Sequence, residues 1–211
     1  MLKLILGIIA AIVLISIIWR LLSRFCVIPC PSWLGWMVEM DNPFTSINRA
    51  KTIIAQLDLK PGMKVADIGC GPGRLTIPLA QAVGPQGSVT AMDIQEEMLA
   101  KVRAKAQAAN LSNIVYLHAG VGQNKLPLNN FDRIVLVTVL GEIPEQLNAL
   151  QEIYRALKPG GILSVTEFIF DPHFQRKATV QRLAQQAGLQ EVACHGSWYA
   201  YTMQFKKQMK A

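Results

Sequence analysis

The chain of 211 residues is 51% hydrophobic and 17% charged, a globular composition that excludes a disordered chain and leaves room for one α/β domain. The net charge of +7 comes from scattered basic residues without interleaved stacking aromatics, which argues against a nucleic-acid partner and favours a solvated basic surface. The cysteines at positions 26, 30, 70 and 194 form neither a C-x-x-C pair nor a His/Cys metal spacing, so we expect no metal site.

Residues 1–24 predict a transmembrane anchor. The segment Leu4–Trp19 carries no charge, Lys3 precedes it, and Arg20 and Arg24 follow it. Its length is near the lower limit of about 17 to 25 residues for a spanning helix. A cleaved signal peptide is the alternative, but no small-residue cleavage site follows the apolar run. We therefore expect a retained single-pass anchor, with the positive C-terminal flank favouring a cytoplasmic domain.

Residues 25–44 form a connector rich in proline and tryptophan. Trp33 and Trp36 suit the lipid interface, and they suit packing against the domain equally well. The third predicted unit is a domain over residues 45–211. It opens with a helix over Ile47–Leu57, for which Thr45 or Ser46 is the expected cap.

A glycine-rich turn follows the first strand, Val65–Ile68, and precedes a helix over Leu75–Val83. Gly69, Gly71 and Gly73 give the spacing G-x-G-x-G, and Asp67 ends the strand. Glycines permit positive φ angles and close approach of the backbone to a ligand, so strand, turn and helix predict a nucleotide-type cradle. The dinucleotide spacing G-x-G-x-x-G requires a glycine at position 74, where this chain has an arginine.

The second strand, Ser88–Asp93, also ends in a carboxylate. Asp93 lies 20 residues after Gly73, which is about where an acid accepts hydrogen bonds from a ribose diol. The alternative is that Asp93 caps the next helix, Gln95–Ala109. A third strand is expected over Ile114–His118.

Strands and helices continue to alternate through the second half of the chain. We expect strand Ile134–Thr138, a helix from Pro144 to Leu157, a turn over Leu157–Gly161, strand Ile162–Phe168, helix Thr179–Ala187, and two final β segments over Gln190–His195 and Tyr199–Phe205. This alternation predicts a mostly parallel sheet covered by helices on both faces.

Three features together resemble class I S-adenosylmethionine-dependent methyltransferases over residues 45–206. They are the segment 67–73, which matches the family's (Asp/Glu)-x-Gly-x-Gly-x-Gly motif, the acid Asp93, and the Leu-Lys-Pro-Gly-Gly turn at 157–161. The resemblance implies a Rossmann-like, seven-stranded sheet whose last strand is antiparallel. It also implies a methyltransferase that uses S-adenosyl-L-methionine.

The resemblance assigns cofactor-binding positions to the ends of four strands. These positions are Asp67, Gly69, Cys70, Gly71, Gly73, Asp93, Ile94, Ala119, Gly120 and Thr138. Many relatives have an acid after the third strand that contacts the adenine amino group. Here the sequence is His118-Ala119-Gly120, so the adenine is expected to contact backbone groups instead.

Methyl transfer is a direct displacement, and a base is needed only where the acceptor must lose a proton. Glu142, just past the fourth strand, is the best candidate for that base, with a structural role as the alternative. Glu167, Asp171 and His173 form a second polar group after the fifth strand. The fourth strand is followed by Val139-Leu140-Gly141 rather than Asn-Pro-Pro-Tyr, which argues against methylation of an amide or exocyclic nitrogen.

The predicted anchor places the domain at a bilayer surface. We therefore expect a lipophilic small-molecule or lipid acceptor, and the membrane itself as a partner. A cofactor made in the cytosol agrees with a cytoplasmic domain. Two alternatives stay open: a non-catalytic, membrane-anchored protein that binds S-adenosylmethionine, and an NAD(P)-dependent oxidoreductase, against which Arg74 argues.

Overall fold

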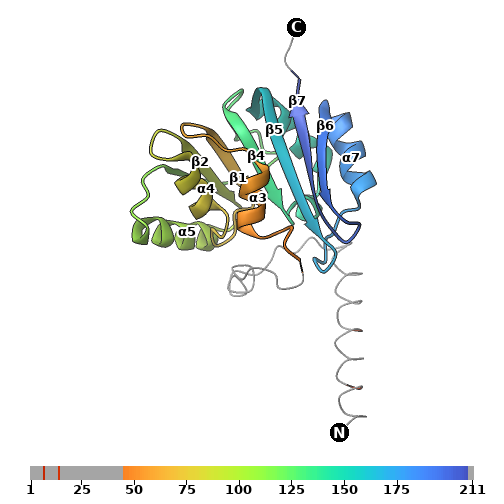
Figure 1. Cartoon of the computed structure of the whole chain (residues 1–211), viewed down its shortest axis with the longest axis horizontal. Helices are drawn as coiled ribbons and strands as arrows, with labels where there is room; N and C mark the ends of the chain where they lie inside the picture. The colour runs from red at the N-terminus through yellow and green to blue at the C-terminus, as the bar shows by residue number, and fades with distance from the viewer. Residues whose placement is uncertain (1–6, 8–13, 15–44, 209–211) are drawn as a thin grey trace.

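The computed structural model describes residues 45–208, together with the isolated positions Gly7 and Leu14 (Figure 1). The predicted anchor (1–24) and connector (25–44) therefore lie, apart from those two positions, outside the described residues. Within the described part of the chain, no helix combines the length and the apolar character needed to cross a bilayer.

Seven strands form one sheet in the order β3-β2-β1-β4-β5-β7-β6. Their bounds are β1 Lys64–Ile68, β2 Ser88–Asp93, β3 Ile114–His118, β4 Phe131–Val137, β5 Leu157–Phe168, β6 Leu189–Gly196 and β7 Ala200–Lys207. Strands β1 to β5 are parallel, whereas β7 is antiparallel to both β5 and β6. The expected Rossmann-like sheet, mostly parallel with an antiparallel last strand, is confirmed.

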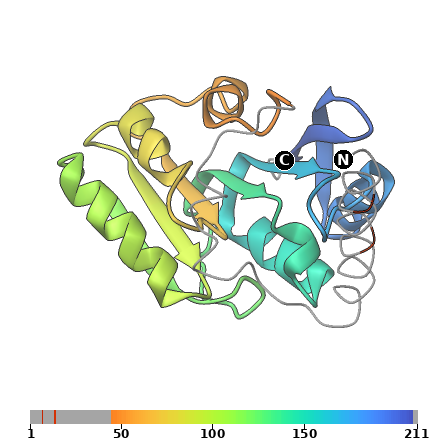
Figure 2. The same ribbon diagram turned by 90° about the horizontal axis from the view of Figure 1, so that it is seen from below.

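Helices cover both faces of the sheet (Figures 1 and 2). The helices are α3 Ala50–Gln56, α4 Thr76–Val83, α5 Glu96–Ala108, α6 Gln146–Ala156 and α7 Lys177–Gln186, with a short 3₁₀ helix, η2, over Leu140–Glu142. Apolar residues of α3, α4 and α5 pack in one buried cluster, and those of α6 and α7 in another. The sheet therefore separates two hydrophobic cores.

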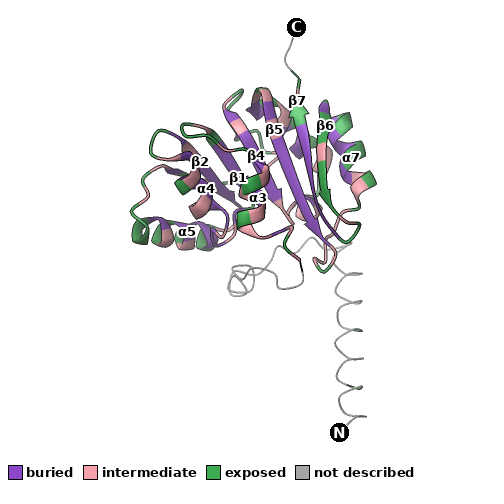
Figure 3. Ribbon diagram, in the orientation of Figure 1, coloured by how far each residue is buried: buried purple, intermediate pink, exposed green. Residues whose placement is uncertain are grey.

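The central strands are buried on both sides (Figure 3). In β4, Val135 packs in the cluster with α3, α4 and α5, whereas Ile134 and Leu136 pack in the cluster with α6 and α7. This alternation follows from the pleat, which sends successive side chains to opposite faces. Continuous burial explains why these strands read as nearly unbroken apolar runs.

Two local predictions were wrong. The segment Leu157–Gly161 is not a turn before the strand but the first part of β5, with Leu157 paired to Phe131 and an irregular register before Arg133. The positive φ of Gly160 (80°) lets the strand absorb this irregularity. Helix α3 begins at Ala50 without a side-chain cap, while the Thr45 hydroxyl accepts a hydrogen bond from the Ile47 N–H.

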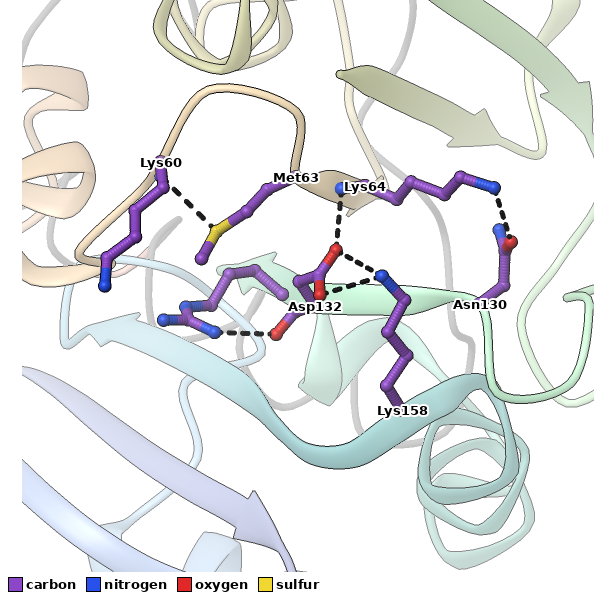
Figure 4. A network of polar contacts seen from close by, with 7 residues as sticks. Lys60, Met63, Lys64, Asn130, Asp132 and Lys158 are labelled. Atoms are coloured by element: carbon purple, nitrogen blue, oxygen red, sulfur yellow. Dashed lines mark hydrogen bonds and ion pairs between the residues drawn. The ribbon is translucent and has the colours of Figure 1, made fainter. Parts of the chain in front are cut away.

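A charged network ties together the amino ends of three neighbouring strands (Figure 4). The Asp132 carboxylate at the start of β4 accepts a hydrogen bond from the Lys64 N–H of β1 at 2.8 Å and from Lys158 Nζ of β5 at 2.7 Å. Lys64 Nζ donates to Asn130 Oδ1 at 3.2 Å. Since parallel sheets bind ligands at their carboxyl ends, this network lies at the edge opposite the expected site.

Candidate functional site

The turn between β1 and α4 has a backbone that only glycine adopts without strain. Gly69, Gly71 and Gly73 have φ angles of 66°, 51° and 87°. A Cβ at Gly69 would lie 2.5 Å from Val139 Cγ2, and a Cβ at Gly73 would lie 3.1 Å from Val102 Cγ2. The glycines therefore let the turn pack closely against Val139 and Val102 at the carboxyl edge of the sheet.

Asp93 connects this turn to the end of β2. Its Oδ2 accepts a hydrogen bond from the Gly71 N–H and its Oδ1 from the Gln95 N–H, both at 2.9 Å. Burial raises the pKa of Asp93, and the backbone N–H groups of Gln95 and Gly71 oppose that rise. The carboxylate thus bonds the backbone of Gln95 and of the glycine turn, but Gln95 itself is the N-cap of α5 and that helix has no side-chain cap, so the capping alternative is wrong. Its assignment to a ribose stays a prediction.

Asp67 and Cys70 lie beneath the turn rather than on its open side. Thr76 Oγ1 donates to Asp67 Oδ2 at 2.6 Å, and both side chains are buried. Burial raises the pKa of Asp67 to about 6 despite this hydrogen bond. Burial also raises the pKa of the Cys70 thiol, so that thiol stays protonated. Both side chains therefore have partners inside the domain, and their assignment to the cofactor stays a prediction.

The loops after β2 and β3 lie side by side. The Ala119 N–H donates to the Asp93 carbonyl at 3.1 Å, and a Cβ at Gly120 would lie 3.3 Å from Ile94 Cγ2. Ile94 is apolar and yet exposed. An exposed apolar side chain beside the glycine turn suits the face of a purine ring, and no acid is needed for that contact.

Thr138, the first residue after β4, has a φ of 55°. A positive φ is rare for a β-branched residue and represents local strain of about 1 to 3 kcal/mol. The Thr138 N–H donates to the Thr166 carbonyl of β5 at 2.8 Å, which holds this conformation. No sequence pattern predicts this strained backbone at the carboxyl end of the central strand.

Glu142, Asp171 and His173 form a cluster beyond the ends of β4 and β5. His173 Nδ1 lies 3.8 Å from Glu142 Oε1 and 4.0 Å from Asp171 Oδ1. Burial raises the pKa of Glu142 to about 8, and the Asp171 and Asp93 carboxylates add to the rise. Burial lowers the pKa of His173. At neutral pH, Glu142 therefore mostly holds a proton and His173 is neutral.

Glu167, at the end of β5, is buried behind this cluster. Its Oε2 accepts a hydrogen bond from the Gln175 N–H at 3.1 Å, while its Oε1 has no partner within residues 45–208. Burial raises the pKa of Glu167 well above its ordinary value. Tyr201 is buried and donates to the Gln175 carbonyl at 2.6 Å, whereas Tyr199 is exposed. Sequence reasoning grouped Glu167, Asp171 and His173 by position, but not with Glu142.

A cavity of about 910 Å³ opens beside this cluster. Its walls come from the segments after β4 and β5, the start of α7 and the β6–β7 hairpin, and include Gly141, Pro144, His173, Phe174, Lys177 and Trp198. The volume lies in the range of about 300 to 1,000 Å³ that small-molecule sites occupy. Within residues 45–208, no His, Cys, Asp and Glu side chains are grouped to hold a metal ion.

The fold and the position of the glycine turn define a class I S-adenosylmethionine-dependent methyltransferase. The chain belongs to the methyltransferase domain family, whose model matches residues 59–208. A solved SAM-dependent methyltransferase from Aquifex aeolicus has the same fold, with a TM-score of 0.74 and 23% identity over 84% of this chain and 98% of that one. The [4+2]-cyclase SpnF also has it, with a TM-score of 0.68 and 17% identity over 77% of this chain and 81% of SpnF.

Curated relatives with higher identity are demethylmenaquinone methyltransferases. The Geobacillus stearothermophilus protein is 36% identical over 112 residues, which cover 53% of this chain and 48% of that protein. The Bacillus cereus protein is 37% identical over 105 residues, which cover 50% of this chain and 44% of that protein. The chain therefore matches about half the length of these relatives.

Proposed function

We propose that the protein transfers a methyl group from S-adenosylmethionine to a lipophilic small-molecule acceptor, a ring of the quinol type, at a membrane surface. The observation that carries this proposal is the 910 Å³ cavity at the carboxyl edge of the sheet, next to the Glu142–His173 cluster. The family membership supports the reaction class. The relatives' name, demethylmenaquinone methyltransferase, supports a quinol-type acceptor.

The residues at the glycine turn fit S-adenosylmethionine. The positive φ angles of Gly69, Gly71 and Gly73 give the turn its shape, Asp93 offers a carboxylate for hydroxyl groups, and exposed Ile94 offers an apolar contact for the purine. When bound, this molecule supplies an electrophilic methyl group on a positively charged sulfur. Ala119, Gly120 and Thr138 belong to the same assigned set through their backbone groups, as do Asp67 and Cys70 on the inner side of the turn.

Glu142 is the proposed proton acceptor. When a ring carbon or hydroxyl gains a methyl group, it loses a proton, and an ionised carboxylate takes that proton. A pKa of about 8 makes Glu142 a stronger base than an ordinary carboxylate while leaving a fraction of it ionised at neutral pH. His173 Nδ1 lies 3.8 Å from Glu142 Oε1, and the backbone N–H of His173 donates to Asp171 Oδ1 at 2.8 Å, which fixes the position of the histidine.

The membrane location rests on the sequence of residues 1–24. The uncharged Leu4–Trp19 run and the flanking Arg20 and Arg24 support a single-pass anchor with a cytoplasmic domain. Protease treatment of sealed inverted vesicles, whose cytoplasmic face points outward, should digest the domain. Digestion only in vesicles of the opposite orientation would overturn the cytoplasmic assignment.

The proposed activity is tested by incubating the full chain with methyl-labelled S-adenosylmethionine and a native-membrane extract, followed by separation of lipid, protein and soluble fractions. Label in the lipid fraction is expected. Label confined to protein would replace the quinol with a membrane-protein acceptor. Cofactor binding without label in any fraction would favour the non-catalytic alternative.

A further inference from the structure

Exposed aromatic side chains gather at the mouth of the cavity. Phe170, Trp198 and Tyr199 are 68%, 72% and 39% exposed, although large aromatic side chains are usually mostly buried. Trp198 and Ile169, the neighbour of Phe170, line the cavity itself. We call Ile169, Phe170, Trp198 and Tyr199 the aromatic rim.

The rim is one connected surface, although its residues come from two loops. The Ile169 N–H donates to the Tyr199 carbonyl at 2.7 Å, which continues the β5–β7 pairing beyond Phe168 and Ala200. Phe170 lies in the turn that the Asp171 N–H closes on the Phe168 carbonyl, and its ring contacts the Phe168 ring with centroids 5.2 Å apart. The Trp198 and Tyr199 rings contact each other edge to face, with centroids 5.7 Å apart. The two loops are therefore joined at the end of the sheet by one backbone hydrogen bond, and ring contacts connect their aromatic side chains to neighbouring rings.

Positive charges flank the rim, and two of the acids nearby are mostly buried. Arg176 is exposed, and Lys177 lines the cavity. Glu142 and Asp171 are only 24% and 19% exposed, whereas Glu145, just before α6, is an exposed acid. An apolar, aromatic surface with a cationic border is complementary to a bilayer that contains anionic headgroups.

The described chain also begins beside the rim. A Cβ at Gly196, in the hairpin that carries Trp198, would lie 3.1 Å from Ile47 Cγ1. Figure 1 shows the start of the segment 45–208 at the end of the sheet to which the β4 and β5 arrows point. The connector 25–44 spans at most about 70 Å when extended, which is ample to let this end of the domain reach the bilayer of the proposed anchor.

We propose that the aromatic rim docks the domain on the surface of an anionic bilayer, so that a lipophilic acceptor enters the cavity directly from the lipid. Trp198, Tyr199 and Phe170 lie at headgroup level, and Arg176 and Lys177 contact the anionic headgroups. This inference rests on the proposed membrane anchor, and it adds the orientation of the domain and the route of the acceptor.

The test uses the full chain reconstituted in vesicles of phosphatidylcholine and phosphatidylglycerol that carry a labelled phospholipid. A photo-crosslinking phenylalanine derivative replaces Phe170 or Trp198, and in the control it replaces Leu128. Leu128 is also 68% exposed but precedes β4, at the opposite end of the sheet. Crosslinking to lipid at positions 170 and 198 should exceed that at position 128 by about tenfold or more.

Two results would overturn the proposal. Equal lipid labelling at all three positions would mean that the rim does not face the bilayer. Crosslinks from position 198 to residues 25–44 of the same chain or to a second copy, without lipid, would mean that protein covers the rim. Crosslinking does not depend on methyl transfer, so this test is independent of the proposed activity. Alkaline extraction of the same vesicles tests the anchor, so a failure of the anchor can be told apart from a failure of the docking proposal.

Discussion

The two edges of the sheet differ in how the charge of a carboxylate at each edge is compensated. At the amino edge, Asp132 accepts hydrogen bonds from Lys64 and Lys158, so its charge is compensated by the strands on both sides. At the carboxyl edge, Thr138 has a strained φ of 55°, and buried Glu167 has an oxygen without a partner in the described residues. The same two hydrophobic cores support both edges.

This difference indicates that residues at one edge of the sheet contribute mainly to stability, and residues at the other edge mainly to function. The strands share their cores along their whole length, so the unfavourable features at one edge are tolerated because the rest of the sheet supports them. Sites that bind and react need bare backbone, shifted pKa values and open volume, and all three occur at the carboxyl edge. We therefore expect substitutions at the carboxyl edge to change binding and rate, and those at the amino edge to change stability.

The largest effect is expected for Gly69→Ala. The added methyl group would lie 2.5 Å from Val139 Cγ2, and the φ of 66° is unfavourable for alanine. The turn must then move, and we expect S-adenosylmethionine affinity to fall by about a hundredfold or more, equivalent to about 2.7 kcal/mol, as measured by titration calorimetry.

Gly62→Ala is the matched control for that substitution. Gly62 also has a positive φ, 86°, but a Cβ there meets nothing within 4 Å, and it lies near the amino end of β1. It should lower the stability by about 1 to 2 kcal/mol and leave the affinity unchanged. Equal losses of affinity in both variants would show that the effect at Gly69 is general backbone strain rather than a blocked site.

Glu142→Gln should lower kcat by about a hundredfold with little change in cofactor affinity, because it removes a proton acceptor. In the parent protein, kcat should rise with pH up to about 8, since burial raises the pKa of Glu142 to about 8 and the ionised form is the base. The variant's residual rate should lack that rise.

The control is Glu145→Gln, which removes an exposed carboxylate three residues further along the chain and should leave the pH dependence of kcat unchanged. A pH-dependent rise that survives in Glu142→Gln would assign the base elsewhere.

Asp93→Ala should weaken S-adenosylmethionine binding by at least about tenfold, or 1.4 kcal/mol, because it removes the acceptor that joins the glycine turn to the end of β2. Asp132→Ala is the matched control, since Asp132 also accepts a backbone N–H, from Lys64 at 2.8 Å. It should reduce the free energy of unfolding but not the affinity. Unchanged affinity in Asp93→Ala would remove this residue from the site.

The parallel sheet was predictable because doubly buried strands alternate with helices along the sequence. The glycine turn and Asp93 were predictable for a related reason: both lie where a parallel strand ends, and such ends meet at one edge of the sheet. Each of these features is predicted by residues that are close together in the chain, so a single sequence is enough to locate them.

The acceptor side was less predictable because it depends on contacts between distant segments. His173 meets Glu142 only once β4 and β5 lie side by side, and the cavity wall also needs Trp198 from the β6–β7 hairpin. The Leu157–Gly161 segment was misassigned because proline and glycine favour turns locally, whereas pairing with Phe131 draws Leu157 into the strand. In each case, tertiary pairing rather than local preference decides the structure.

The smallest effect is expected for Lys158→Met at the amino edge. The change keeps the apolar stem and removes the ion pair with Asp132, which involves a lysine side chain that is 39% exposed. Partly exposed ion pairs contribute about 0.2 to 1 kcal/mol, so urea unfolding should show a loss within that range, and the loss should shrink in about 1 M salt. Cofactor affinity should not change, because β5 continues unbroken from Leu157 to Phe168 and its cores stay packed. A tenfold change in affinity would mean that the edges are coupled through β5, and that stability and function are not divided between them.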